Sequence, residues 1–316
     1  MARKKKGDPV HGWVCLDKPY DLTSTSAVSK VRWLFQAQKA GHAGTLDPLA
    51  TGILPIALGE ATKTVPYLMD ADKVYEFTIA FGKTTDSYDA EGCVIAESDA
   101  RPTHDAIEAA LPQFIGIIDQ VPPAFSAIKV DGERAYDLAR AGHEVELQAR
   151  EVEVFDLALG TFDGETATLT LHCGKGTYVR SIARDLCTML GVCGHVSALR
   201  RTRVGAFATK DAITLEMLSD LVHRGAAYEA LLGVETALDD IPALPVTQEE
   251  ASKLKQGRDL ALLPRQFATV AEALKVRRQA GPEAFPETVQ AVLNGQVQAL
   301  CHVRDGKLFP VRILNL

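Results

Sequence analysis

The residues from 73 to 82 alternate cleanly between the two sides of an extended backbone. One side carries Tyr75, Phe77, Ile79 and Phe81, and the other carries Glu76 and Thr78. A period of two with aromatic and β-branched residues on one side predicts a β-strand whose apolar face packs against a core. Any fold of this chain must therefore contain a sheet with one face covered.

Further helices and strands are predicted on both sides of this strand. Apolar spacing and capping residues predict helices at residues 27–37, 103–111, 135–141 and 178–190, and strands at 152–159 and 167–173. These elements are mixed in order and show no regular βαβ repeat. The expected fold class is therefore α+β with a mixed or antiparallel sheet, and not a doubly wound parallel sheet.

The composition changes around residues 241–245, where two prolines flank a short apolar segment. We expect three parts: a basic tail at residues 1–10, a large domain at 11–240 and a small β-rich domain at 241–316. In the small domain, the pattern predicts a helix at 248–255 and strands at 297–303 and 308–314. The segment 263–288 is polar and contains three prolines, so we expect a surface insertion or a long loop there.

One acid stands in a loop that is rich in glycine. Residues 40–52 have the sequence AGHAGTLDPLATG and place Asp47 between two apolar segments. The glycines permit tight turns and close approach of a ligand to the backbone. Pro48 restricts Asp47 to extended or turn geometry, so its carboxylate has a fixed, non-helical position. Asp-Pro is also common in ordinary turns and helix caps, so local chemistry alone leaves a structural role open.

The net charge of the chain is −7, which taken alone argues against a nucleic-acid partner. Two regions are nevertheless basic, since residues 172–210 contain seven Lys or Arg against one acid and residues 1–50 contain eight against four. A local basic surface on an acidic protein can bind phosphates. We therefore expect the arginines at 180–203 to bind phosphates, although a solvated charged face would have the same composition.

No segment approaches the run of about 18 apolar residues that a membrane helix needs. The N-terminal region also has no apolar core long enough for a signal peptide, so we expect a cytoplasmic protein without membrane contact. The six cysteines are scattered and form no C-x-x-C pair, which predicts free and mostly buried thiols. The sequence contains no dinucleotide-binding fingerprint, no P-loop and no metal-binding cluster.

The segment around Asp47 resembles the catalytic motif of the pseudouridine synthases, and specifically of the bacterial TruB family, which acts on uridine 55 of tRNA. The resemblance covers residues 11–240. It is carried by the segments GWVCLDKP (12–19), LGEATK (58–63), 82–92, QVPPAFSA (120–127), KGTYVR (175–180) and LRR (199–201), in the order of the family. The C-terminal region resembles the PUA-like RNA-binding domain of the family through its position and its closing strands.

The resemblance implies an isomerase that acts on the T-loop of tRNA and needs no cofactor or metal. The family breaks the bond between uracil N1 and ribose C1′, rotates the base and joins its C5 to C1′. Asp47 matches the essential aspartate of the family, which acts as nucleophile or base. Arg180 matches the arginine that pairs with this aspartate, and such a guanidinium favours and orients the ionised carboxylate. The helical pattern alone would make Arg180 a surface arginine.

Four further residues match positions around the RNA site of the family, and a fifth, Lys18, is a candidate beside them. Tyr75 matches the tyrosine that stacks on the target base, and Tyr178 and Leu199 match residues that line the uracil pocket. His42 matches the histidine that fills the space left by the flipped nucleotide. Lys18 is expected to support the site or to contact phosphate. Each also has an ordinary explanation, because tyrosine and leucine suit a core, and histidine and lysine suit polar turns.

Two other functions are compatible with part of this pattern. A tRNA-folding helper would grip the elbow without chemistry, but it would not need an acid inside an anion-binding groove. A guide-RNA-dependent synthase would share the catalytic motif, and the lack of evident extra docking segments argues against it. The resemblance also implies a monomer that acts on the T-arm without a protein partner.

Overall fold

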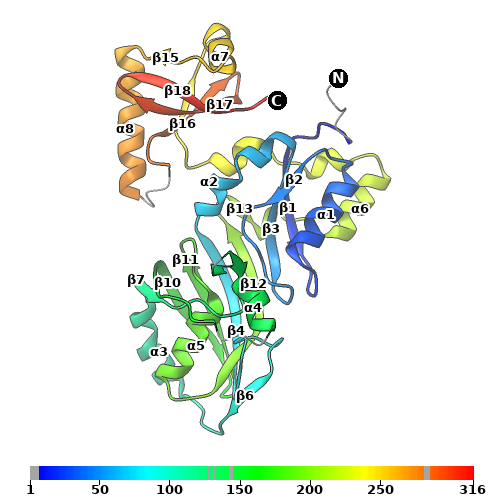
Figure 1. Cartoon of the computed structure of the whole chain (residues 1–316), viewed down its shortest axis with the longest axis vertical. Helices are drawn as coiled ribbons and strands as arrows, with labels where there is room; N and C mark the ends of the chain where they lie inside the picture. The colour runs from blue at the N-terminus through cyan, green and yellow to red at the C-terminus, as the bar shows by residue number, and fades with distance from the viewer. Residues whose placement is uncertain (1–6, 127, 131, 142–144, 281–284) are drawn as a thin grey trace.

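The computed structural model describes residues 7–126, 128–130, 132–141, 145–280 and 285–316. A large sheet runs through most of the elongated molecule, and a smaller sheet lies at the end that carries α7 and α8 (Figure 1). Within the described residues the large sheet has the order β1-β3-β12-β4-β11-β10-β7, with β2 beside β3 and β13 beside β12. The pair β3 and β12 is parallel, and the other pairs are antiparallel. The expected α+β fold with a mixed sheet is confirmed.

The strands of the large sheet have the following bounds: β1 (Gly12–Lys18), β2 (Ala40–His42), β3 (Thr51–Leu58), β4 (Lys73–Phe81), β7 (Gly116–Gln120), β10 (Arg150–Phe162), β11 (Thr166–Cys173), β12 (Gly194–Val204) and β13 (Phe207–Ala208). The apolar face of strand β4 forms part of one hydrophobic core, as its alternation predicts. Phe77 and Ile79 are fully buried in a cluster that includes Ile182 and Leu186 of helix α5 (Val179–Met189). The apolar stripe of α5 thus covers this face of the sheet.

Strands β1 and β3 form the other half of the sheet. Neither strand shows the alternation of apolar and polar residues that predicted β4. Helices α1 (Ser24–Leu34) and α6 (Leu215–His223) pack on one side, and the 3₁₀ segment η5 (Val234–Leu238) and the small sheet contribute to the cluster on the other. Because both sides are covered, apolar residues follow one another in β3 without a polar partner face. The predicted helix at 27–37 corresponds to α1, which Thr23 caps by accepting a hydrogen bond from Ser26 N.

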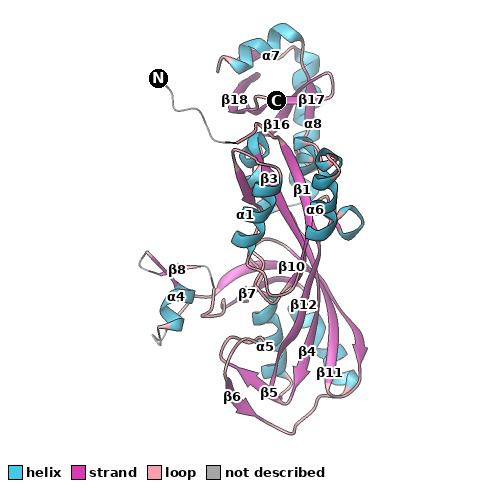
Figure 2. Ribbon diagram, turned by 90° about the vertical axis from the view of Figure 1, so that its right-hand side faces the viewer, coloured by secondary structure: helices cyan, strands magenta, loops and turns pink. Residues whose placement is uncertain are grey.

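Shorter elements surround the large sheet. They are α2 (Val65–Asp70), α3 (His104–Ala110), α4 (Ala135–Arg140) and the hairpins β5 (Lys83–Thr85) with β6 (Val94–Glu97) and β8 (Lys129–Val130) with β9 (Glu133–Arg134). Figure 2 shows that α4 and β8 project from one side of the molecule. The predicted helices at 103–111 and 135–141 are confirmed as α3 and α4, whereas Gly142, expected to end the second, lies outside the described residues.

The small sheet has the order β14-β16-β17-β18-β15. Its strands are β14 (Ala243–Pro245), β15 (Leu260–Ala261), β16 (Thr288–Leu293), β17 (Gln296–Arg304) and β18 (Lys307–Ile313). Helix α7 (Gln248–Lys255) has the predicted bounds and begins with a capping box between Thr247 and Glu250. The two predicted closing strands are confirmed as β17 and β18.

The expectation of a long loop at residues 263–288 is wrong, because Pro264–Ala280 form helix α8. Proline is compatible with the first helical position, where the backbone N–H would have no partner in any case. Val270 and Leu274, one turn apart, are buried in the core of the small sheet, so the apolar stripe is narrow and leaves little trace in the sequence. Among the described helices, α8 included, none is both long and apolar enough to cross a membrane.

Four of the six cysteines are buried, namely Cys15, Cys173, Cys187 and Cys301. Burial raises the pKa of Cys173 to about 11 and that of the other three thiols to about 12. Since the thiolate is the reactive form, we expect a thiol reagent to modify the exposed Cys93 first, Cys193 next, and the other four only after unfolding. Counting reactive thiols with and without denaturant checks this, and rapid native modification of a buried thiol would contradict it.

Candidate functional site

Asp47 lies in the turn between β2 and β3. The hydroxyl of Ser24, at the start of α1, fixes this turn because it donates to Leu46 O and accepts from Leu46 N, both at 2.9 Å. Ala50 N donates to Asp47 O at 3.1 Å, which closes the turn. The Asp47 side chain is 41% exposed. Its carboxylate is therefore held by rigid backbone and remains accessible.

Gly52 is the second residue of β3, the strand that follows this turn, and has a φ of +99°. A Cβ there would lie 2.2 Å from the carbonyl oxygen of Arg201, which pairs with Gly52 in parallel register. We expect Gly52→Ala to lower the free energy of unfolding by about 1–3 kcal/mol, because the two strands must move apart. Gly41→Ala is the control, since a Cβ there would meet no atom within 4 Å. Urea unfolding of both variants checks this, and equal midpoints would contradict it.

Arg180 connects Asp47 to a second acid from a distant loop. It lies in the first turn of α5, and its side chain is 6% exposed. Nη2 of Arg180 lies 3.1 Å from Oδ2 of Asp47, and Nη1 lies 3.3 Å from Oδ2 of Asp89. Charge-assisted contacts of this kind fix orientation as well as position. Arg180 therefore sets the direction in which the Asp47 carboxylate points.

The surroundings of Arg180 hold its guanidinium in one place. Nη1 donates to Ser87 O at 3.2 Å, and Nη2 donates to Phe125 O at 2.9 Å. Asp89 in turn accepts from the hydroxyl of Ser87 at 2.6 Å and from Glu91 N at 3.0 Å. Three loops that are separate in the sequence thus meet at one buried side chain.

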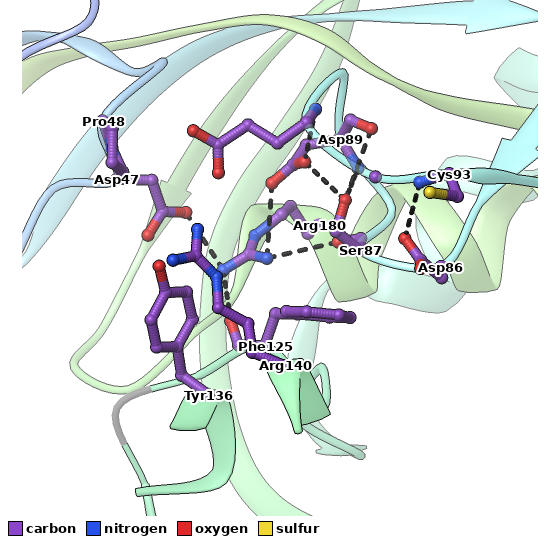
Figure 3. A pocket seen from close by; sticks show the side chains of 12 residues that line it. Asp47, Pro48, Asp86, Ser87, Asp89, Cys93, Phe125, Tyr136, Arg140 and Arg180 are labelled. Carbon is purple, nitrogen blue, oxygen red and sulfur yellow. Dashed lines mark hydrogen bonds and ion pairs between the residues drawn. The ribbon is translucent and has the colours of Figure 1, made fainter. Parts of the chain in front are cut away.

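A cavity of about 220 Å³ opens beside this cluster. Figure 3 shows Asp47 and Arg180 on its wall, with Tyr136 and Arg140 of α4 close by. The guanidinium of Arg140 lies 4.4 Å from the centre of the Tyr136 ring, within cation–π range. Burial and the nearby aspartates raise the pKa of Glu91, which lines the same cavity. Among the described residues, no group of three or more His, Cys, Asp or Glu is arranged to hold a metal ion.

Two expected pocket residues lie on neighbouring strands close to this cluster. Leu199 of β12 lines a small recess together with Asp47, Asp89 and Arg180. Tyr75 of β4 packs against both of the cores in this part of the sheet, and burial raises the pKa of its hydroxyl. The structure therefore brings Asp47, Arg180 and Leu199 to one recess and places Tyr75 near them.

Lys18 is fully buried at the end of β1. Its Nζ donates to the carbonyl oxygens of Pro19 at 2.9 Å, Leu22 at 2.7 Å and Pro48 at 3.0 Å. Burial lowers the pKa of Lys18 to about 8, and the charge of Asp47 acts in the opposite direction. Of the two expected roles, this geometry fits support of the turn after Asp47 and not contact with phosphate.

His42 and Tyr178 lie outside the two recesses. His42 pairs with Ile56 across β2 and β3, and its Nδ1 is buried without a hydrogen-bond partner among the described residues. Burial and the charge of Arg201 lower the pKa of His42. Tyr178 is the N-cap of α5, where its N–H donates to Oε1 of Gln120 at 2.8 Å. Tyr178 therefore lies at the start of the helix that carries Arg180.

The arginines of β12 are held by the protein itself. Arg200 and Arg203 form ion pairs with aspartates at 2.7 and 2.6 Å. Arg201 is only 2% exposed. The expectation that the arginines at 180–203 bind phosphates is therefore wrong for Arg180 and Arg201, which are buried. The composition gives the number of charged residues in a segment. It does not indicate which of these residues are paired with carboxylates or carbonyl oxygens inside the fold.

Sequence reasoning does not single out three residues of this cluster, Asp89, Tyr136 and Arg140. Asp89 lies in the polar segment 82–92, which belongs to the family resemblance, and α4 follows the segment QVPPAFSA. The clustering of acids at 86–91 was the available signal for Asp89. Nothing in the sequence of a short helix indicates that it faces Asp47. No sequence signal therefore marked Tyr136 and Arg140 as residues of the site.

Two family models match this chain. The model "TruB family pseudouridylate synthase (N terminal domain)" matches residues 32–179, which include the Asp47 turn. The model "tRNA pseudouridylate synthase B C-terminal domain" matches residues 180–239, which begin with Arg180. Together the two matched regions contain both partners of the ion pair between Asp47 and Arg180.

Bacterial relatives are similar to the chain over its full length. A protein named tRNA pseudouridine synthase B from Caulobacter vibrioides is 62% identical, with 100% of both chains covered. Its namesake from Bradyrhizobium diazoefficiens is 49% identical over 100% of this chain and 91% of that one.

Two solved structures with a similar fold are chains of larger complexes. A chain of a Cbf5-Nop10-Gar1 complex has a TM-score of 0.68 and 25% identity, covering 92% of this chain and 78% of that one. A chain of an H/ACA RNP bound to a substrate RNA containing 2′-deoxyuridine has a TM-score of 0.72 and 21% identity, covering 100% and 92%. The second likeness concerns the fold alone.

Proposed function

Because the chain belongs to the TruB family of pseudouridylate synthases, we propose that it isomerises uridine 55 in the T-loop of tRNA. The chain is a pseudouridine synthase, and relatives named tRNA pseudouridine synthase B support tRNA as its substrate. The reaction breaks the bond from uracil N1 to ribose C1′ and forms one from C5 to C1′. C5 loses a proton and N1 gains one, so substrate and product have the same composition.

The observation that carries this proposal is the accessible carboxylate of Asp47 held by the buried guanidinium of Arg180, with 3.1 Å between Nη2 and Oδ2. An acid in a fixed direction suits attack on the ribose or removal of a ribose proton, and either role needs only one carboxylate. Asp89 and two backbone carbonyls hold the guanidinium, so Asp47 is oriented before the substrate arrives.

The target nucleotide must leave the stacked elbow of tRNA before it can reach Asp47. Extrusion of a nucleotide costs about a few kcal/mol of stacking and pairing. In this proposal Tyr75, Tyr178 and Leu199 contact the flipped uracil, and His42 occupies the space it leaves. The recess that Leu199 shares with Asp47 and Arg180 supports the role of Leu199.

The rest of the chain has supporting roles in this proposal. Residues 11–240 form the catalytic domain, and residues 241–316 form a PUA-like unit that binds RNA. The basic tail at residues 1–10 adds non-specific attraction to phosphates. The enzyme acts as a monomer in the cytoplasm, binds the T-arm without a protein partner and uses no cofactor.

Release of tritium from C5 of uracil tests the reaction directly. Purified protein is added alone to an unmodified tRNA transcript that carries tritium at C5 of its uridines. We expect release of one tritium for each tRNA. A transcript with cytidine at position 55 should release none, because the remaining uridines are not substrates.

The same assay separates the proposal from its alternatives. Tight tRNA binding without tritium release would favour a tRNA-folding helper. Release only after addition of a guide RNA would favour a guide-dependent synthase. Release that persists in the transcript with cytidine 55 would keep the reaction and refute the position.

A further inference from the structure

We propose that Arg201 is a positioning residue that fixes the Asp47 turn and Tyr75 relative to each other, an inference that rests on the proposed function of the site. Arg201 lies on β12, between β3, which follows the Asp47 turn, and β4, which carries Tyr75. From this central strand its side chain reaches backbone on both sides of Asp47.

Arg201 holds both ends of the Asp47 turn. Before Asp47, the guanidinium donates to Gly44 O at 3.2 Å and to Thr45 O at 3.4 Å. After Asp47, Nε of Arg201 donates to Ile53 O at 2.8 Å. Both ends of the turn are thereby tied to one planar group, which limits the movement of the carboxylate between them.

The partners of Arg201 distinguish it from the neighbouring arginines. Arg180 and Arg200 form ion pairs with carboxylates, whereas Arg201 forms none among the described residues. It is 2% exposed, and backbone carbonyl oxygens accept its hydrogen bonds. Burial of a charge without an ionic partner is costly, and an apolar side chain would fill such a space more cheaply. Packing alone therefore does not explain a guanidinium here, but the three carbonyls do.

Tyr75 is the direct cross-strand neighbour of Arg201. The charge of the guanidinium opposes the burial that raises the pKa of the Tyr75 hydroxyl, as expected for two side chains that lie close together. Arg201 thus bonds the backbone around Asp47 and lies beside the tyrosine expected to stack on uracil. A change in its length would alter the position of both groups together.

An arginine suits this position better than a lysine. The guanidinium carries five N–H donors in a rigid fork, so it can bond the carbonyls on both sides of Asp47 at once. An ammonium keeps the charge but concentrates its donors on one atom. Arg201→Lys should therefore retain part of the arrangement, and Arg201→Gln should lose most of it.

The test compares these two variants with Arg101→Gln. Arg101 is the control because its guanidinium also donates to two backbone carbonyls, of Ser98 and Ala100, in a loop outside the candidate site, although it differs from Arg201 in its ion pair with the exposed Glu165. Single-turnover tritium release with excess enzyme measures the chemical step, and filter binding measures tRNA affinity. We expect Arg201→Gln to slow release about a hundredfold with affinity changed less than about threefold, and Arg201→Lys to recover about tenfold. Arg101→Gln should match the native enzyme in both.

Hydrogen exchange supplies a readout that does not depend on the reaction. Amides of residues 43–50 should exchange faster in Arg201→Gln than in the native protein or in Arg101→Gln. Unchanged exchange in a variant with the native release rate overturns the proposal, as does a rate loss matched by an equal loss of tRNA affinity. Absence of release by the native enzyme would instead refute the proposed function, and the exchange measurement would still decide the role of Arg201.

Discussion

Replacement of Asp47 by asparagine is expected to abolish pseudouridine formation and to leave tRNA binding largely intact. Asparagine has nearly the same shape and keeps an oxygen that can accept from Arg180, but it is neither a nucleophile nor a base at neutral pH. Loss of the central reactive group typically lowers a rate by about ten-thousandfold or more. Single-turnover tritium release measures the loss, and filter binding measures the affinity for the same transcript.

Two further variants make this result secure. Asp47→Ala should be as inactive as Asp47→Asn, and it excludes activity that arises from slow conversion of asparagine back to aspartate. Asp99→Asn is the control, because Asp99 is an exposed acid outside the candidate site. A rate for Asp47→Ala within tenfold of that of Asp99→Asn would refute the proposed role of Asp47.

Replacement of Arg180 by glutamine is expected to reduce both activity and stability. It removes the positive charge between Asp47 and Asp89, and the carbonyl oxygens of Ser87 and Phe125 lose their donor. We expect the release rate to fall about a thousandfold, because the direction of the Asp47 carboxylate is no longer set. The free energy of unfolding should fall by about 3–5 kcal/mol, since the largely buried Asp89 is left without its partner. Urea unfolding and single-turnover release measure the two effects separately.

Arg180→Lys separates charge from geometry. Lysine keeps the positive charge but offers one ammonium, which cannot span two carboxylates and two carbonyls. Its stability should lie between those of the native protein and Arg180→Gln, while its activity remains low. Asp89→Asn should also lower activity, because Arg180 loses its ion pair with Asp89. Full activity in Arg180→Gln would show that Asp47 needs no partner.

Local patterns predicted those elements that have one covered face. The alternation around Phe77 predicted β4, and the apolar stripe of Tyr178–Leu190 predicted α5. Both signals exist because a half-buried strand or helix must repeat its apolar residues at its own period. Strand β3 is covered on both sides and α8 is mostly exposed, so neither shows such a contrast. Tertiary packing decided both of these elements.

Residue types and family resemblance predicted Asp47 and Arg180, and the structure pairs them. The same reasoning missed Asp89 and Arg140 and assigned Arg201 to phosphate. Arg180 donates to Ser87 O across 93 positions, and Arg201 donates to Gly44 O across 157. No local pattern encodes contacts between residues so far apart.

By itself the sequence determined the strand and helix periods, the glycine and proline limits on the Asp47 turn, and the acid and base chemistry available to the chain. These properties depend on neighbouring residues, whose sterics and side chains are readable in order. The tertiary structure alone decided that Arg201 is buried among carbonyls, that Lys18 faces inward and that Asp89 shares Arg180 with Asp47. Burial and charge pairing depend on which distant strands become neighbours. The order of the strands in the sheet, which forms only in the folded chain, determines this.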